Sequence, residues 1–112
     1  MEFHERWEQG GIKVIAIAGN LDTTSVAELR ARFLEATDVD VPVVLDCAGL
    51  YYLDSNGLAF LVNLLKKMNA RESRLVLCGL PDSIVRVLQF TKLDTVFTLS
   101  PTREEAVGML RS

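Results

Sequence analysis

The sequence predicts a single α/β domain, with a small mixed, largely parallel sheet that opens with an antiparallel edge hairpin and has about four helices packed against it. After two strand-like segments, strand and helix patterns alternate to the end of the chain, an order that produces parallel strands joined by helices. The 112 residues are 49% hydrophobic and 24% charged, as expected of one globular core. No linker or repeat interrupts the pattern, so we expect one domain over residues 1–112.

The opening segments have the pattern of a β-hairpin. Residues 3–8 alternate weakly between apolar and polar side chains, and residues 13–18 form a more apolar strand pattern. Gln9-Gly10-Gly11 lies between them and suits a tight turn, because glycine adopts positive φ angles without strain. We therefore expect an antiparallel pair with the Trp7 strand at the sheet edge.

The first helix is predicted over residues 24–37, where apolar residues recur at helical spacing. Thr23, Thr24 or Ser25 could cap its start, because short hydroxyl side chains accept hydrogen bonds from first-turn amides. Four apolar residues should share its inner face: Val26, Leu29, Phe33 and Leu34.

The rest of the chain supplies the parallel part of the sheet. Strands are expected at residues 41–45, 74–78 and 96–99, and residues 48–53 should connect a strand to the next helix. Helices are expected at residues 55–69, from Pro81 to about residue 91, and from Ser100-Pro101 onward, where a cap precedes a first-turn proline.

Composition argues against several classes of function. The net charge is −3 and no basic run occurs, whereas a nucleic-acid surface needs clustered Lys and Arg. The first residues lack the basic-then-apolar pattern of a signal peptide. No apolar run approaches the roughly 20 residues needed to cross a bilayer. We expect a cytoplasmic protein without membrane insertion.

Signatures of catalysis and of metal or cofactor binding are missing from the sequence. Cys47 and Cys78 each end an apolar strand pattern and lack zinc-ligand spacing, so we expect them to pack in the core. His4 lies in the first strand without an evident partner. Neither a glycine-rich phosphate loop nor a Gly-x-Gly-x-x-Gly sequence occurs. We therefore expect no cofactor and no enzymatic activity.

A serine stands where an apolar segment gives way to the second helix, in Leu53-Asp54-Ser55-Asn56-Gly57-Leu58. One interpretation is structural: Ser55, or Asp54 in its place, caps the helix. The other is regulatory, because an exposed hydroxyl at a helix N-terminus can receive a phosphate. Gly57 costs a helix about 0.5–1 kcal/mol relative to alanine, which suggests that a backbone or a partner approaches it closely.

The same helix carries apolar residues beside its predicted core stripe. Phe60 and Leu64 lie on one flank, with Lys67 below them. If they are partly exposed, they suit a docking surface; the alternative is that they pack against a neighbouring helix.

Two acidic residues precede the first two helices. Asp22 and Asp54 could bind a metal ion next to a phosphate, because magnesium prefers carboxylate oxygens. The commoner outcome is that both cap turns or helices.

The chain resembles the STAS family, specifically the anti-sigma-factor antagonists of bacteria. The resemblance rests on Gly19-Asn20-Leu21-Asp22, Val44-Leu45-Asp46 and Asp54-Ser55-Asn56-Gly57-Leu58. It implies a small sheet covered by helices, and it implies that Ser55 is phosphorylated by a partner that is both a serine kinase and an anti-sigma factor.

The resemblance also implies a cycle and a set of site residues. The unphosphorylated form binds the kinase and frees a sigma factor, and a PP2C-type phosphatase resets the cycle. The residues around the phosphorylated serine would be Asp22, Asp54, Asn56 and Gly57. Many family members have Ser or Thr at the position of Asn56, and asparagine keeps the capacity to form hydrogen bonds there. Partner contacts are expected on the second helix, at Leu58, Phe60, Asn63 and Lys67.

Two other functions remain open at this point. The chain could be a constitutive STAS subunit of a membrane transport complex, such as one for lipids, that uses the same face without phosphorylation. It could also be an enzyme acting through Asp22 and Asp54, although no general base or phosphate cradle accompanies them.

Overall fold

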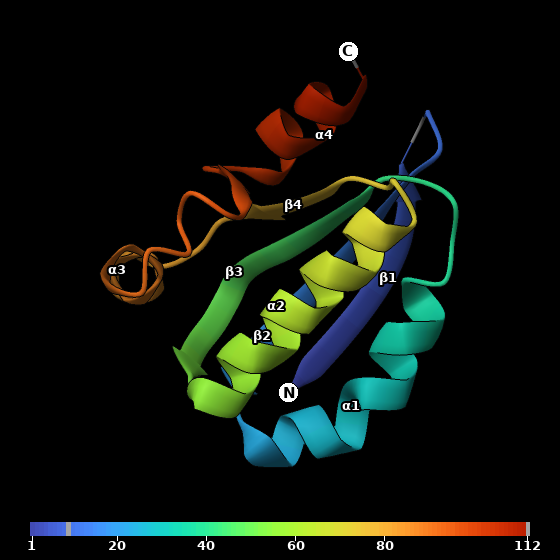
Figure 1. Ribbon diagram of the computed structural model, residues 1–112. Coiled ribbons are helices and arrows are strands. Elements are labelled where there is room, and N and C mark those ends of the chain that lie inside the picture. The colour runs from blue at the N-terminus through green and yellow to red at the C-terminus, as the bar shows by residue number, and fades with distance from the viewer. Residues whose placement is uncertain (9, 112) are drawn as a thin grey trace.

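A five-stranded mixed sheet forms the centre of the computed structural model, which describes residues 1–8 and 10–111 (Figure 1). In sheet order the strands are β1 (Glu2–Glu8), β2 (Ile12–Leu21), β3 (Val43–Leu53), β4 (Leu75–Cys78) and β5 (Thr98–Ser100). β1 is antiparallel to β2, and every other neighbouring pair is parallel. This confirms the predicted fold class.

Helices cover both faces of this sheet. They are α1 (Thr23–Ala36), α2 (Ser55–Ala70), α3 (Asp82–Phe90) and α4 (Arg103–Arg111). The larger buried cluster joins one sheet face to α1, α2 and α3, and the smaller one joins the other face to α4. Figure 1 shows α2 running alongside β3 with α1 beside it, while α3 lies off to the left. α1 and α2 therefore share one layer.

Phe33 on α1 lies at the centre of the larger cluster. Its ring is fully buried and meets the rings of Phe3 and Phe60 edge to face, with centroids 4.8 Å apart in both pairs. Edge-to-face pairs add about 0.5–1.5 kcal/mol to the free energy gained by burial. These contacts tie β1, α1 and α2 together.

The predicted hairpin is present. Gly10 and Gly11 have φ angles of 90° and 73°, a region that favours glycine. Gln9, which the sequence also placed in this turn, lies outside the described residues. β1 has β2 as its neighbour on one side and lies at the edge of the sheet, as predicted.

The expectation that residues 48–53 are a connection is wrong. They continue β3, because they pair with an extension of β2: Ala18 with Gly49, Gly19 with Leu50 and Leu21 with Leu53, across two irregularities in register. Glycine, asparagine and tyrosine in these segments hide the alternation that normally reveals a strand. The two strands consequently end side by side.

Three further expectations need correction. Leu34 is 44% exposed, and Ala36 is buried near the end of α1 instead. Ser100 belongs to β5, which runs Thr98–Ser100 rather than over residues 96–99. α4 begins at Arg103, and the hydroxyl of Thr102 accepts a hydrogen bond from Glu105 N at 3.1 Å. The prediction misplaced this cap because several hydroxyl residues precede the helix.

Cys47 and Cys78 are buried free cysteines, as predicted. Burial raises the pKa of the Cys47 thiol far above its usual value and that of Cys78 to about 12. Both thiols are therefore uncharged at neutral pH and serve packing. Within residues 1–8 and 10–111, no helix combines the length and apolar character needed to cross a bilayer.

Candidate functional site

The site forms where β2 and β3 end beside each other. Leu21 pairs with Leu53, so the next residues, Asp22 and Asp54, emerge at the same edge of the sheet. Each is the N-cap of a helix, Asp22 of α1 and Asp54 of α2. Two helix N-termini with their partial positive charges thus lie together.

Asp22 caps α1 through a reciprocal pair of hydrogen bonds. Its Oδ1 accepts from Ser25 N at 3.0 Å, and its own N–H donates to Ser25 Oγ at 2.9 Å. The prediction that Thr23, Thr24 or Ser25 is the cap is therefore wrong, because the acceptor that reaches the first-turn amide belongs to Asp22. Ser25 is the other half of this capping box.

Asp54 caps α2 and also holds α1. Its Oδ1 accepts from Gly57 N at 2.8 Å, and its Oδ2 accepts from Thr23 N at 3.1 Å and from Thr23 Oγ1 at 3.4 Å. Hydrogen bonds from Gly57 and Thr23 hold the pKa of this carboxyl below its usual value. One carboxylate therefore serves both helix N-termini.

Ser55 is the first residue of α2 and is exposed. Since Asp54 is the cap, the Ser55 hydroxyl is not needed for that role. Among the described residues none forms a hydrogen bond with this hydroxyl. The side chain is accordingly accessible for modification.

Gly57 is required by a close backbone contact. A Cβ atom at this position would lie 2.1 Å from the carbonyl oxygen of Leu21 and 3.0 Å from Cδ1 of Leu53. Asp54 N also donates to the Leu21 carbonyl at 3.2 Å. The first turn of α2 thus lies directly against the end of β2.

A third link was missed by the sequence analysis. Asn56 Nδ2 donates to Thr23 Oγ1 at 2.6 Å, so the threonine hydroxyl joins Asn56 and Asp54 across the two helices. No sequence pattern marks this hydrogen bond, because its two residues lie 33 positions apart in the chain.

The apolar flank of α2 formed by Phe60 and Leu64 is buried. Phe60 and Leu64 are 5% and 3% exposed and pack into the cluster beneath α1 and α2, so the alternative of packing against a neighbouring helix holds and partial exposure does not. Lys67 Nζ donates to the Leu34 carbonyl and to Thr37 Oγ1, both at 2.9 Å, and is thereby engaged with the end of α1.

The remaining predicted contact residues are more accessible. Asn63 is exposed, and Leu58 is half-buried against the core. A groove of about 300 Å³ runs between α1 and α2 from the site, with lining residues Thr23, Val26, Ala27, Arg30, Asn56, Ala59, Phe60 and Asn63. Phe60 is part of the lining of this groove, and the Arg30 guanidinium lies 5.9 Å from its ring centroid.

Metal binding by Asp22 and Asp54 finds no support. Each carboxylate is already used as a helix cap, the commoner outcome for such residues. Over the described part of the chain, no three His, Cys, Asp or Glu residues gather as a metal site would require.

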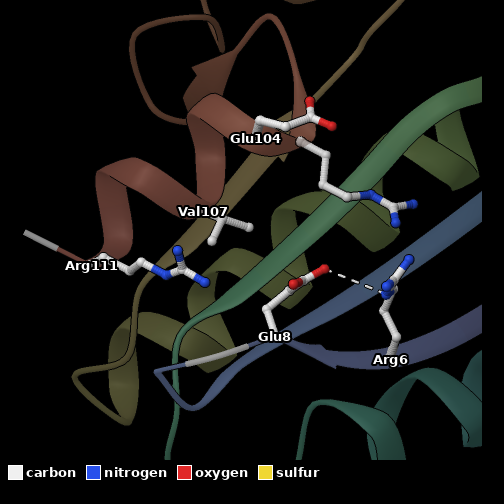
Figure 2. A pocket seen from close by; sticks show the side chains of 6 residues that line it. Arg6, Glu8, Glu104, Val107 and Arg111 are labelled. Atoms are coloured by element: carbon white, nitrogen blue, oxygen red, sulfur yellow. Dashed lines mark ion pairs between the residues drawn. The ribbon is translucent and has the colours of Figure 1, made fainter.

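A second hollow lies on the α4 face of the sheet (Figure 2). Its charged lining residues come from β1 and α4: Arg6, Glu8, Arg103, Glu104 and Arg111. Arg6 pairs with Glu8 at 3.4 Å, and Arg103 pairs with Asp46 at 2.7 Å. Val107 completes the lining, and the hollow lies on the opposite sheet face from α2.

Comparison with known proteins shows which family this chain belongs to. The STAS domain model matches residues 5–106, and the chain belongs to the STAS domain family. The anti-sigma-B factor antagonist of Listeria monocytogenes is 31% identical over 96 residues, covering 84% of this chain and 83% of that protein. The anti-sigma F factor antagonist of Lysinibacillus sphaericus is 25% identical over 100 residues, covering 88% and 85%.

Solved structures share the fold. A STAS domain protein from Planctomyces limnophilus, described as an anti-sigma-factor antagonist, superposes with a TM-score of 0.87 at 24% identity, covering 98% of each chain. The anti-sigma factor antagonist SpoIIAA in its unphosphorylated form gives 0.74 at 23% identity, covering 99% of each chain. SpoIIAA of Bacillus also has a structure in the phosphorylated form.

Replacement of Gly57 by alanine should destabilise the fold by about 1–3 kcal/mol, the usual cost of overpacking, because the new methyl group meets the Leu21 carbonyl. Gly108→Ala is the matched control: it lies in α4 with nothing within 4 Å of its added methyl group. It should stabilise by up to about 1 kcal/mol through helix propensity. Urea unfolding measures the free energy of unfolding of both variants. Equal changes in the two variants would contradict the close contact between residue 57 and the Leu21 carbonyl.

Asp54→Asn removes the charge and keeps one oxygen that can cap α2 through Gly57, while an NH2 group replaces the oxygen that accepts from Thr23. Because folding lowers the pKa of Asp54 below 3.8, its ionised form contributes stability above that pH, and the contribution is lost as pH falls through the lower folded value. The difference in unfolding free energy between wild type and Asp54→Asn should be greatest near neutral pH and shrink below pH 3.8. Urea titrations across this pH range test the prediction. A difference in unfolding free energy that does not change with pH would contradict a stabilising role for the ionised form of Asp54.

Proposed function

We propose that this protein is an anti-sigma factor antagonist whose binding is switched off by phosphorylation of Ser55. Its partner is an anti-sigma factor that is also a serine kinase, and a PP2C-type phosphatase restores the unmodified form. The observation that carries the proposal is the exposed, unbonded hydroxyl of Ser55 at the first residue of α2. Membership of the STAS family and similarity to relatives named as anti-sigma factor antagonists support it.

The position of Ser55 suits a charge switch that leaves the fold intact. A phosphate adds about −1.5 to −2 charges at neutral pH. First-turn amides and the helix dipole favour that charge, and among the described residues none forms a hydrogen bond with the Ser55 side chain that the phosphate would have to break. The carboxylates of Asp22 and Asp54 add to the negative charge at this position. An acidic partner surface would be repelled by the phosphate, and an apolar one would strip it of water at a large cost in free energy.

The docking face that we propose is the exposed side of α2 that begins at Ser55. It comprises Ser55, Asn56, Leu58, Ala59 and Asn63, and it borders the groove between α1 and α2. Phe60 contributes at the floor of that groove, and Lys67 acts indirectly by holding the end of α1. A partner seated on this face would lie against any phosphate on Ser55.

Ser55→Asp should weaken binding to the cognate serine kinase at least about a hundredfold, because a like charge or an unpaired desolvated charge at an interface costs several kcal/mol. Isothermal titration calorimetry with the purified kinase measures the affinity, and circular dichroism should stay native. Ser83→Asp is the matched control, since Ser83 is an exposed serine in the first turn of α3 and should bind like wild type.

If Ser55→Asp bound the kinase as tightly as wild type, the proposal that a negative charge at this position blocks binding would be wrong. Ser55→Ala completes the test: it should bind the kinase but accept no phosphate from ATP. Phosphate transfer to the Ser55→Ala variant would show that another residue is the substrate.

A further inference from the structure

The groove between α1 and α2 is open because short side chains face it from both helices. Ala27 of α1 and Ala59 of α2 are exposed and belong to its lining, and neither fills the space of about 300 Å³. The buried side chains of Val26 and Phe60 add apolar surface to the same lining. The groove can therefore receive an apolar side chain of another molecule.

Arg30 supplies the charge of this groove. Its guanidinium lies 5.9 Å from the ring centroid of Phe60, within the range of a cation–π contact. Among the described residues that line the groove, none carries a carboxylate, and none in the described chain forms an ion pair with Arg30. Three other arginines do pair with carboxylates: Arg6, Arg71 and Arg103.

The sequence of α1 explains why Arg30 has no carboxylate beside it. On a helix, ion pairs form between residues three or four positions apart. At those separations from Arg30 the chain has only uncharged residues, namely Val26, Ala27, Phe33 and Leu34. The Arg30 guanidinium is therefore available to a carboxylate of another molecule.

An unpaired guanidinium beside an apolar hollow favours one kind of occupant. Guanidinium groups bind carboxylates through two parallel hydrogen bonds. Asn63, exposed on α2 in the same lining, offers an amide that can donate to a carboxylate oxygen. A basic segment would be repelled by Arg30. The best fit is a peptide segment in which an acidic residue stands next to an apolar one.

We propose that the anti-sigma factor kinase docks such a segment here, with an apolar side chain between Ala27 and Ala59 and a carboxylate on Arg30. This rests on the proposed function, because it takes the kinase as the occupant. Arg30 lies about 10 Å further along α1 than Thr23, which lines the groove together with Asn56, the residue after Ser55. The groove thus selects the partner, while Ser55 controls whether it binds.

The first test reverses the charge of Arg30. In isothermal titration calorimetry with the purified kinase, Arg30→Glu should bind about thirtyfold more weakly than wild type, because two like charges then meet in the interface. Arg6→Glu is the matched control: it makes the same change in net charge at the hollow on the opposite sheet face (Figure 2). It should bind within about twofold of wild type, and both variants should keep native circular dichroism.

The second test fills the groove without changing its charge. Ala27→Leu should weaken kinase binding about tenfold, because the larger side chain takes the space that the partner needs. Ala31→Leu is the matched control, since Ala31 is an exposed alanine of the same helix outside the groove lining, and it should bind like wild type. Urea unfolding should show that both variants are as stable as wild type.

The third test identifies the group that pairs with Arg30. p-Benzoylphenylalanine at position 63 is crosslinked to the bound kinase, and mass spectrometry identifies the captured segment. That segment should contain an Asp or Glu whose replacement by Arg improves binding to Arg30→Glu at least about fivefold and weakens binding to wild type. A captured segment without an acidic residue would overturn the proposal.

Wild-type affinity in either Arg30→Glu or Ala27→Leu, with binding still weakened in Ser55→Asp, would overturn the groove proposal and leave the proposed function standing. Wild-type affinity in Ser55→Asp alone would overturn the charge switch and leave the groove supported. A kinase that does not bind wild type would overturn both. Self-association that Arg30→Glu abolishes, measured by analytical ultracentrifugation, would assign the groove to a second copy of this chain and overturn the kinase as its occupant.

Discussion

The carboxylate of Asp54 connects the parts of this domain that matter for its proposed function. It accepts hydrogen bonds from Gly57 at the start of α2 and from Thr23 at the start of α1, and it follows directly on β3. Two helices and the end of the sheet are thus fixed by one ionised group. Because this group does the capping, the neighbouring Ser55 hydroxyl is left exposed on a rigid support.

The close approach of α2 to β2 makes that support rigid. Gly57 allows the first turn of the helix to lie on the Leu21 carbonyl, and any larger residue would push the helix away. Beneath this contact, Phe33 and Phe60 pack edge to face in the buried layer. A charge added at Ser55 therefore changes the surface of a domain whose core is held elsewhere, which is the property that a reversible protein switch requires.

Much of the fold follows from sequence patterns, whereas the details of the site depend on contacts between distant segments. The alternating strand and helix patterns predict the mixed sheet with its edge hairpin, and Gly57 predicts a close approach. The extension of β3 through residues 48–53 could not be read locally, because its pairing with the end of β2 replaces the missing apolar alternation.

The same limit explains the errors around the site. Aspartate, threonine and serine are all good caps, so sequence alone could not choose Asp22 over Thr23, Thr24 or Ser25. Phe60 and Leu64 are buried because α1 packs on that flank of α2, and helical periodicity does not show which flank a neighbour covers. The hydrogen bond between Thr23 and Asn56 joins residues far apart in the chain and carries no sequence signature.

The central claim is that Ser55 is the residue on which regulation acts. Phosphopeptide mass spectrometry of the protein purified from its own cells, together with the partner captured on it, tests this most directly. The account predicts phosphate on Ser55 in part of the population, bound partner only on the unmodified part, and serine kinase activity in that partner. An active kinase partner bound to protein that carries its phosphate elsewhere, with Ser55 always unmodified, would contradict it.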